Sequence, residues 1–162
     1  MDYLWSPWRY RYVTGAEPTA GCIFCHKVEE NQDEKNLILC RGLNNFVLLN
    51  IYPYTSGHLM IAPYRHVGQL SMADDATWSE LMMLTRKAEQ AIQTAYKPEG
   101  VNLGMNLGKS AGAGIADHIH MHVLPRWHAD SNFISVIGET RVLPEALEDT
   151  YRKLRPLFSS SG

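Results

Sequence analysis

The chain has 162 residues, of which 45% are hydrophobic and 20% are charged, and its formal net charge is -2. This length fits one domain with a core of its own, which excludes a small disulfide-held scaffold and a disordered tail. Because 15 basic residues stand against 17 acidic ones, there is no general positive field, and we expect neither nucleic acid nor a membrane as a partner. We recognise no signal-peptide pattern and no membrane-length apolar run, and therefore expect a cytoplasmic protein.

Residues 1–40 show no clear periodicity and include a polar stretch at 29–36, so we expect an irregular N-terminal arm. A core follows over residues 44–126. Its first two apolar runs, at 44–50 and 58–64, are separated by a segment with Pro, Ser and Gly. This pattern predicts a β-hairpin.

Helical spacing of apolar residues predicts a long helix that begins near Ser71 and Asp74 and ends at the KPEG sequence, residues 97–100. The remaining predicted elements are a strand at 101–106, a glycine-rich loop at 108–114, a strand at 117–125 that ends at Pro125, and a C-terminal helix from Pro144 within the flank 127–158. Because the chain shows no repeat and no linker, we expect one α+β domain over residues 1–162 with a largely antiparallel sheet.

Three of the seven histidines, His118, His120 and His122, fall within five residues. On a strand they would project from one face, opposite an apolar face. Packing explains a single histidine better than three in strict alternation. One metal for all three is disfavoured, because the outer Cα atoms would lie roughly 13 Å apart while Zn–N bonds are about 2.0–2.1 Å. We expect instead a nucleophilic imidazole and a neighbour that binds the attacked group or protonates the leaving group.

The sequence HIHMHVL at 118–124 resembles the histidine triad (HIT) superfamily of nucleotidyl transferases and hydrolases, which act at the α-phosphate of a nucleotide. With CIFC at 22–25 and the segments 48–67 and 112–138, it is similar to the bacterial branch that includes diadenosine tetraphosphate phosphorylases. The resemblance implies a HIT-like α+β fold, a dinucleoside polyphosphate substrate with adenine bases, and a homodimer. It leaves open whether phosphate or water accepts the nucleotidyl group.

The same resemblance implies roles for individual residues. His120 would be the nucleophile that forms a nucleotidyl-histidine, and His122 would contact the phosphate and the leaving-group side. Hexose-1-phosphate uridylyltransferases carry Gln at that third position, so His122 disfavours their branch. Asn50 would bind the ribose hydroxyls, and His58 would line the nucleotide pocket. Without the resemblance, these two would be an ordinary strand-end residue and a turn residue.

The glycine-rich loop does not fit a P-loop, because only three residues separate Gly104 from Gly108 and no helix follows. Such a loop can still bring backbone N–H groups close to a phosphate, although a flexible turn without a ligand is the alternative. The resemblance places the phosphate loop here, and it implies contacts by Asn106, Lys109, Ser110, Ala113 and Gly114. Either Lys109 or Arg126 would also hold distal phosphates.

Cys22 and Cys25 form a CxxC, which suggests either two zinc ligands or a redox pair. Zinc-bearing histidine triad proteins pair such a CxxC with the equivalents of His66 and His118, so the resemblance implies a closed, structural zinc site. His26 competes for the third position, and Cys40 reads as a small buried residue.

We therefore expect an enzyme that cleaves dinucleoside polyphosphates, such as diadenosine tetraphosphate, through nucleotidyl-His120. Three alternatives stay open: a zinc-stabilised module that binds or senses a nucleotide without turnover, a hydrolase that holds a metal on two triad histidines, and a histidine triad hydrolase of another nucleotide conjugate.

Overall fold

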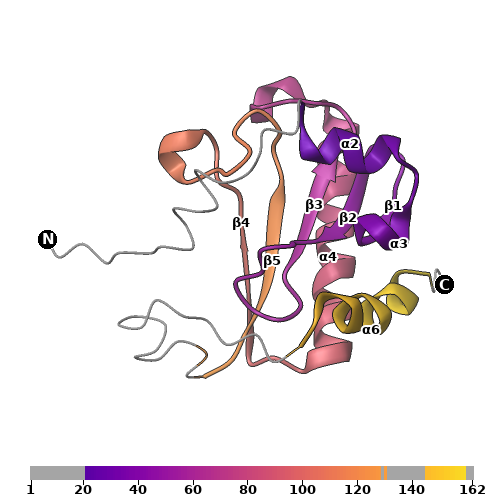
Figure 1. Cartoon of the computed structure of the whole chain (residues 1–162). Helices are drawn as coiled ribbons and strands as arrows, with labels where there is room; N and C mark the ends of the chain where they lie inside the picture. Colours follow the sequence, from indigo (N-terminus) through magenta and orange to yellow (C-terminus); the bar gives the residue numbers. More distant parts are fainter. Residues whose placement is uncertain (1–20, 129, 131–144, 160–162) are drawn as a thin grey trace, which may run out of the picture.

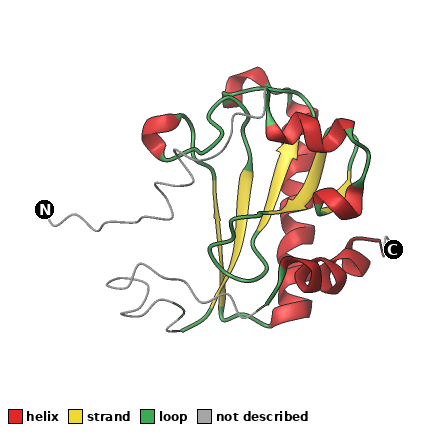
Figure 2. Ribbon diagram, viewed as in Figure 1, coloured by secondary structure: helices red, strands yellow, loops and turns green. Residues whose placement is uncertain are grey.

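The computed structural model describes residues 21–128, 130 and 145–159. They form an antiparallel five-stranded sheet in the order β1-β2-β3-β5-β4, with helices packed against it (Figures 1 and 2). The strands are β1 (Ile38–Arg41), β2 (Asn45–Leu49), β3 (Leu59–Pro63), β4 (Gly100–Gly104) and β5 (Met121–Arg126). The helices are α2 (Ile23–Glu29), α3 (Asp33–Asn36), α4 (Asp75–Tyr96) and α6 (Leu147–Ser159), with 3-10 turns η1 (Leu70–Met72) and η2 (Lys109–Ala111). The α+β fold with an antiparallel sheet is confirmed.

Residues 1–20 of the expected N-terminal arm, and 129 and 131–144 of the C-terminal flank, lie outside the described residues. Within the described ranges, no helix combines the length and the apolar character that a bilayer crossing requires.

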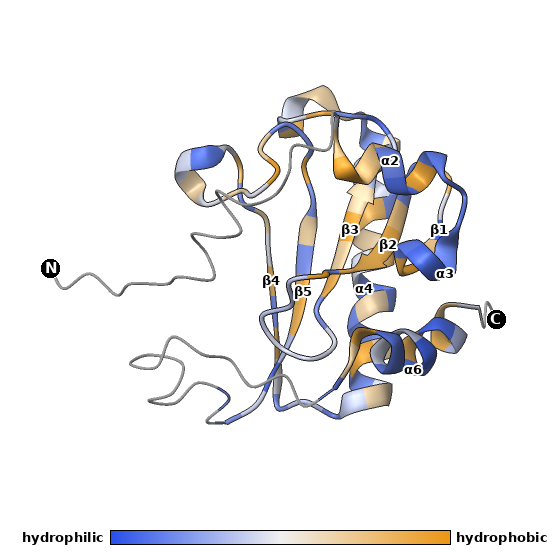
Figure 3. Cartoon of the chain, in the orientation of Figure 1, coloured by the Kyte–Doolittle hydropathy of each residue, from blue (hydrophilic) through white to orange (hydrophobic). Residues whose placement is uncertain are grey.

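The sheet carries an apolar cluster on each face, because side chains alternate along its strands. Val47 of β2 belongs to the main core, with α4 and α6. Phe46 of the same strand lies in a second cluster with Phe24 of α2. In β5, Val123 belongs to the main core, so His122 projects toward the α2 face. Figure 3 shows the apolar character of β2 and β3, which lie between α4 and α2.

The long helix α4 begins at Asp75, directly after its N-cap residue Asp74 and four residues after Ser71, the earliest predicted start. Asp74 accepts a hydrogen bond from the backbone N–H of Thr77 at 2.8 Å, which satisfies an otherwise unpaired donor of the first turn. Ser71 lies instead in the separate turn η1, which ends at the extended residue Ala73. The helix ends at Lys97, in the left-handed conformation (φ 47°) and directly before Pro98.

The expectation of an irregular arm over residues 1–40 is wrong for residues 23–40, most of which lie in α2, α3 and β1. The polar sequence conceals this order because polar side chains hold the segment together. Arg41 pairs with Asp33 and donates to the carbonyl of Val28 at 3.2 Å. Lys27 donates to the carbonyl of Asn36, also at 3.2 Å. One apolar side chain, Phe24, is 1% exposed and anchors α2 on the sheet.

The predicted strand at 117–125 is shorter at its start, since β5 begins at Met121 and extends to Arg126. His122 therefore lies in the strand opposite Met60, whereas His118 and His120 precede it. Pairing of β5 with β3 stops at Val123. Pro125, which has no N–H to donate, thus lies beyond the part of β5 that is paired on both sides.

Candidate active site and metal centre

His120 and His122 form a close pair at the beginning of β5. Their ring centroids are 4.8 Å apart with an interplanar angle of 73°, and the two residues are 5% and 9% exposed. His122 is the second residue of β5, and His120 directly precedes the strand. Both rings project from the sheet face that α2 partly covers.

The proton of the His120 imidazole is fixed by its own backbone neighbourhood. Nδ1 lies 3.0 Å from the carbonyl oxygen of His118. Because a carbonyl only accepts, Nδ1 carries the proton and Nε2 keeps its lone pair. Burial lowers the pKa of His120, so the ring is neutral at neutral pH. A neutral imidazole that keeps its lone pair on Nε2 is the form required of a nucleophile.

His122 has the opposite arrangement, because a chain of donors reaches its Nδ1. The backbone N–H of Tyr54 donates to His58 Nδ1 at 3.2 Å, so His58 carries its proton on Nε2. That Nε2 donates to His122 Nδ1 at 2.9 Å, which leaves the proton of His122 on its own Nε2. Burial, followed by the nearby His120, lowers the pKa of His122 to about 4. His122 is thus a neutral donor beside a neutral nucleophile.

The structure places Asn50 and His58 in this same cluster. Asn50 Oδ1 accepts from the backbone N–H of Tyr52 at 2.9 Å, which turns Nδ2 toward His58 Nδ1 at 3.3 Å. His58 is 1% exposed and contacts His122 through its ring nitrogen. Gly57 precedes it with φ +82°, where an added Cβ would lie 2.9 Å from the ring of Tyr96. The tight turn that delivers His58 therefore requires glycine.

The glycine-rich loop joins β4 to the histidine segment. Gly108 and Gly112 both have positive φ, 81° and 90°, and they flank the turn η2. Lys109, Ser110 and Gly114 are exposed, while Asn106 and Ala113 are half-buried. Three residues, 115–117, connect the loop to His118.

Arg126 lies at the opposite end of β5 from His122, and its guanidinium is already engaged. Nε and Nη2 bind the two carboxylate oxygens of Asp130 at 2.6 and 2.8 Å, and Nη1 donates to Asn102 Oδ1 at 2.7 Å. Four residues along a strand span roughly 13 Å. These contacts favour a structural tether for Arg126 over a phosphate ligand.

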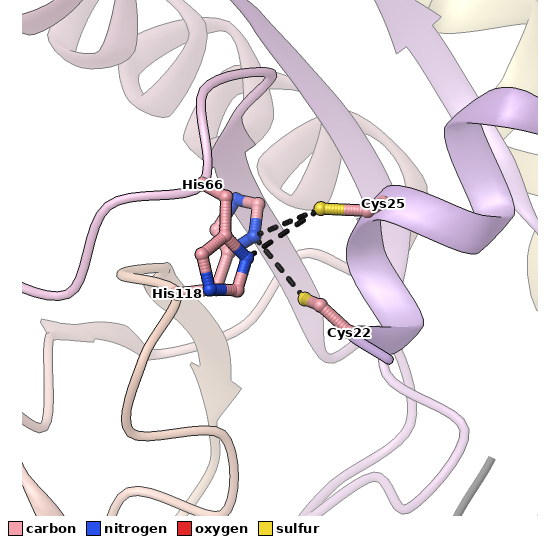
Figure 4. A group of neighbouring side chains, drawn as sticks. All are labelled: Cys22, Cys25, His66 and His118. Atoms are coloured by element: carbon pink, nitrogen blue, oxygen red, sulfur yellow. Dashed lines mark hydrogen bonds between the residues drawn. The ribbon is translucent and has the colours of Figure 1, made fainter. Parts of the chain in front are cut away.

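Cys22, Cys25, His66 and His118, the set that the resemblance implied, converge, and their ligand atoms all lie within 4.8 Å of one another (Figure 4). Cys22 Sγ is 3.2 Å from His118 Nδ1, Cys25 Sγ is 3.7 Å from the same nitrogen, and Cys25 Sγ is 3.5 Å from His66 Nδ1. Among the described residues, this cluster includes His66 and not its sequence competitor His26.

The three Sγ–Nδ1 separations, 3.2, 3.5 and 3.7 Å, are close to those around a tetrahedral ion, although the widest separation in the group approaches 4.8 Å. With Zn–S bonds of about 2.3 Å and Zn–N bonds of about 2.0–2.1 Å, tetrahedral geometry places neighbouring ligand atoms roughly 3.3–3.8 Å apart. His118 Nε2 donates to the carbonyl oxygen of Pro63 at 2.8 Å, which leaves Nδ1 free to face the sulfurs. Burial lowers the pKa of His118 and keeps it in the neutral form that binds metals. Two thiols and two imidazoles, with no open position, suit a structural metal.

Two aromatic residues of the site carry no motif of their own, and sequence reasoning missed them. Phe24 lies between the two cysteines, with its ring centroid 5.1 Å from that of His118 and 5.0 Å from that of His120. Tyr54 packs on His58 at 4.8 Å and stacks on His122 at 6.1 Å. Their only sequence signal is proximity to the CxxC and to His58. Cys40 packs at the edge of the main core, away from both groups.

Residues 32–129 match the HIT domain model. The chain belongs to the HIT domain family. The matched residues contain all three triad histidines and His66, whereas Cys22 and Cys25 lie before them.

Similar proteins extend the comparison beyond the domain. An AP-4-A phosphorylase of Mycobacterium tuberculosis is 41% identical over 161 residues, which cover 95% of this chain and 83% of that protein. A bis(5'-adenosyl)-triphosphatase of Dictyostelium discoideum is 26% identical, over 72% of this chain and 82% of that one. The crystal structure of a Zn-bound histidine triad family protein from Mycobacterium smegmatis superposes with a TM-score of 0.69 at 26% identity, covering 86% of this chain and 94% of the other.

Proposed function

We propose that this protein cleaves dinucleoside polyphosphates, diadenosine tetraphosphate foremost, at an α-phosphate through a nucleotidyl-His120 intermediate. The observation that carries the proposal is the pair of neighbouring rings in which Nε2 of His120 is unprotonated and Nε2 of His122 carries a proton. The 41% identical relative is an AP-4-A phosphorylase, which supports the choice of substrate.

In the first step, His120 Nε2 attacks the α-phosphorus. A P–N bond forms as the bond from phosphorus to the bridging oxygen breaks, and the leaving group departs with that electron pair. From diadenosine tetraphosphate, AMP stays on His120 and ATP leaves. The Nε2–H of His122 can donate to a phosphate oxygen as charge develops there. His118 supports the reaction through its backbone carbonyl, which stabilises the positive charge on Nδ1–H.

In the second step, an acceptor attacks the same phosphorus from the side that the leaving group vacated, and the P–N bond breaks. Phosphate as acceptor gives ADP, whereas water gives AMP, and both restore the neutral imidazole of His120. The name of the mycobacterial relative favours phosphate.

For the nucleotide itself, Asn50 and His58 are the proposed ribose and pocket residues. The phosphates would lie against the loop residues Asn106, Lys109, Ser110, Ala113 and Gly114. Backbone N–H groups and one lysine can hold them locally, so a chain with net charge -2 needs no globally basic surface.

The proposed occupant of the Cys22, Cys25, His66 and His118 cluster is a structural zinc ion. When bound, it supplies a rigid cross-link between α2 and the segments that carry His66 and His118. Metal-binding thiols must stay reduced, which is consistent with our proposal that the protein is cytoplasmic.

We also propose a homodimer. Among the described strands, β4 is an edge strand with one neighbour. Leu103 on this strand is 51% exposed, and Leu107 in the following loop is 43% exposed. A second copy would pair with this edge and cover both side chains.

The deciding experiment is product analysis of diadenosine tetraphosphate with and without inorganic phosphate. A phosphorylase forms ADP and ATP only with phosphate, and a hydrolase forms AMP and ATP in either case. Tight nucleotide binding with no products under either condition would overturn the proposal in favour of a sensing module.

A further inference from the structure

One side chain joins the two clusters, and no motif assigns it a role. Phe24 is in α2, one residue before Cys25, and is 1% exposed. Its ring contacts the metal-facing His118 on one side and the proposed nucleophile His120 on the other, at centroid distances of 5.1 and 5.0 Å. Its third ring contact is an edge contact with Phe46, at 6.4 Å.

Helix geometry explains how one short segment serves both clusters. Cys22 is the extended N-cap residue of α2 and Cys25 lies in its first turn, and the sulfurs of both lie on the side that faces His118, at 3.2 and 3.7 Å from its Nδ1. Each residue turns the direction by about 100°, so Phe24 projects beside that side and not along it. Movement of the cysteines therefore carries the Phe24 ring with it.

The attachment of α2 to the sheet is divided along its length. Its C-terminal half is held by polar contacts, from Arg41 to the carbonyl of Val28 and from Lys27 to the carbonyl of Asn36. Its N-terminal half faces His118 and His66 through sulfurs at 3.2 and 3.5 Å. A metal on the cysteines would fix that half, and with it the position of Phe24.

His120 needs this support, because one hydrogen bond does not fix a ring. The Nδ1–H bond to the carbonyl of His118 sets the tautomer, but rotation about that bond would swing Nε2 away from the α-phosphorus. The Phe24 ring blocks this rotation on one side, and His122 lies against His120 at 4.8 Å on another.

We propose that Phe24 is a positioning residue that couples the Cys22, Cys25, His66 and His118 cluster to the catalytic imidazole. Metal binding fixes α2, and Phe24 in turn holds His120 with Nε2 toward the substrate. This inference rests on the proposed role of His120 as the nucleophile. It makes the metal site part of the catalytic machinery by position, although the ion touches no substrate.

The test compares Phe24→Leu with Phe46→Leu, both as zinc-loaded full chains. The two substitutions remove a ring from the same apolar cluster, but among the described residues the ring contacts of Phe46 are with Phe24 and Tyr64 and not with a histidine. Because small misplacements of reacting groups cost up to about 100-fold in rate, we expect Phe24→Leu to slow nucleotidyl-enzyme formation by roughly 10- to 100-fold. KM should stay within about twofold, and Phe46→Leu should stay within about threefold in rate.

Two further measurements separate positioning from folding. Bound zinc should remain near one per chain in Phe24→Leu. The Nδ1–H proton resonance of His120 should be sharp in zinc-loaded wild type and Phe46→Leu, and broadened by exchange both in Phe24→Leu and in chelated wild type. If Phe24→Leu loses zinc or unfolds, Phe24→Met, which keeps most of the volume, replaces it.

The outcomes are distinct. A wild-type rate in Phe24→Leu, or an equal loss in Phe46→Leu, overturns the positioning role. A His120 resonance that is unchanged on chelation overturns the coupling to the metal. If wild type forms no nucleotidyl-enzyme at all, the proposed function fails, while the resonance measurements still decide whether Phe24 orients His120.

Discussion

His118 of the proposed metal cluster and His120 of the proposed catalytic pair are the same side chain in opposite tautomers. His118 donates from Nε2 to the carbonyl of Pro63 and presents Nδ1 to two sulfurs. His120, two residues later, donates from Nδ1 to the carbonyl of His118 and keeps its lone pair on Nε2. A backbone carbonyl that occupies one nitrogen selects which nitrogen is left for chemistry. Two histidines that are two residues apart can thus present different nitrogens, one to a metal and the other to the phosphorus of a substrate.

The largest expected effect comes from removing the nucleophile. His120→Ala takes away the only atom that forms the P–N bond, so kcat should fall by at least about 10⁴-fold. A radiolabelled nucleotide should no longer be trapped on the denatured protein, and zinc content should be unchanged. His128→Ala is the matched control, because His128 is exposed and lies beyond β5. Full turnover in His120→Ala would falsify the covalent mechanism.

On the metal side, Cys22→Ser should abolish stoichiometric zinc binding. Loss of a thiolate ligand removes the cross-link between α2 and the sheet. We therefore expect the free energy of unfolding to fall by about 3 kcal/mol or more. Cys40→Ser provides the control, since Cys40 lies at the edge of the main core outside the cluster, and it should cost about 1 kcal/mol with full zinc content. Retention of one zinc per chain in Cys22→Ser would remove that residue from the ligand set.

The catalytic pair should also make stability depend on pH. His122 faces the rings of His120 and His58, and its pKa is lowered to about 4. A lowered histidine pKa means that the unfolded chain binds the proton better. The contribution of neutral His122 is therefore complete above about pH 6.5 and is lost progressively toward pH 4, to a total of about 3 kcal/mol.

Denaturant unfolding of wild type and His122→Gln, from pH 7 to pH 4.5, isolates this contribution. The difference in unfolding free energy between the two proteins should narrow as pH falls, because only wild type has the titrating ring. A difference that stays constant over this range contradicts a neutral, buried His122.

His58 tests whether the donor chain orients His122. His58→Asn removes the Nε2–H that donates to His122 Nδ1 and frees His122 to adopt the other tautomer. We expect kcat to fall by roughly 10- to 100-fold, as for other groups that orient a catalytic ring. Nitrogen-15 spectra of the wild-type rings should show the proton on Nε2 of both His58 and His122. A proton on Nδ1 of His122 would contradict the chain from Tyr54.

The sequence allowed much of the fold to be predicted because apolar periodicity repeats along β2, β3 and α4. The cluster was different: the CxxC alone left zinc and redox chemistry open, and only the family resemblance implied His66 and His118 as its partners. The predicted start of β5 was wrong because polar and apolar residues also alternate in the segment before the strand, where His118 and His120 lie. The strand begins only where pairing with β3 begins, at Met121, and that partner lies some 60 residues away in the chain.

The contacts that select each tautomer were beyond sequence reasoning. The acceptor for His118 is the carbonyl of Pro63, and the donor for His58 is the N–H of Tyr54. Almost every residue has the same backbone carbonyl and N–H groups, so residue type does not indicate which of them a histidine will contact. The role of Phe24 was missed for a related reason. An apolar residue in a short helix indicates that the residue is packed, but it does not indicate which side chains it contacts.

The smallest expected effect separates two cations that the sequence treated alike. Lys109 is exposed in the glycine-rich loop, whereas Arg126 is bound to Asp130 and Asn102 at the far end of β5. Lys109→Ala should raise KM for diadenosine tetraphosphate by about 3- to 10-fold, with kcat nearly unchanged, because one exposed phosphate contact contributes about 1 kcal/mol. Arg126→Gln should leave KM within about twofold, since its guanidinium is not available to the substrate. Equal increases in KM for both variants would place Arg126 at the phosphates and show that the substrate displaces Asp130.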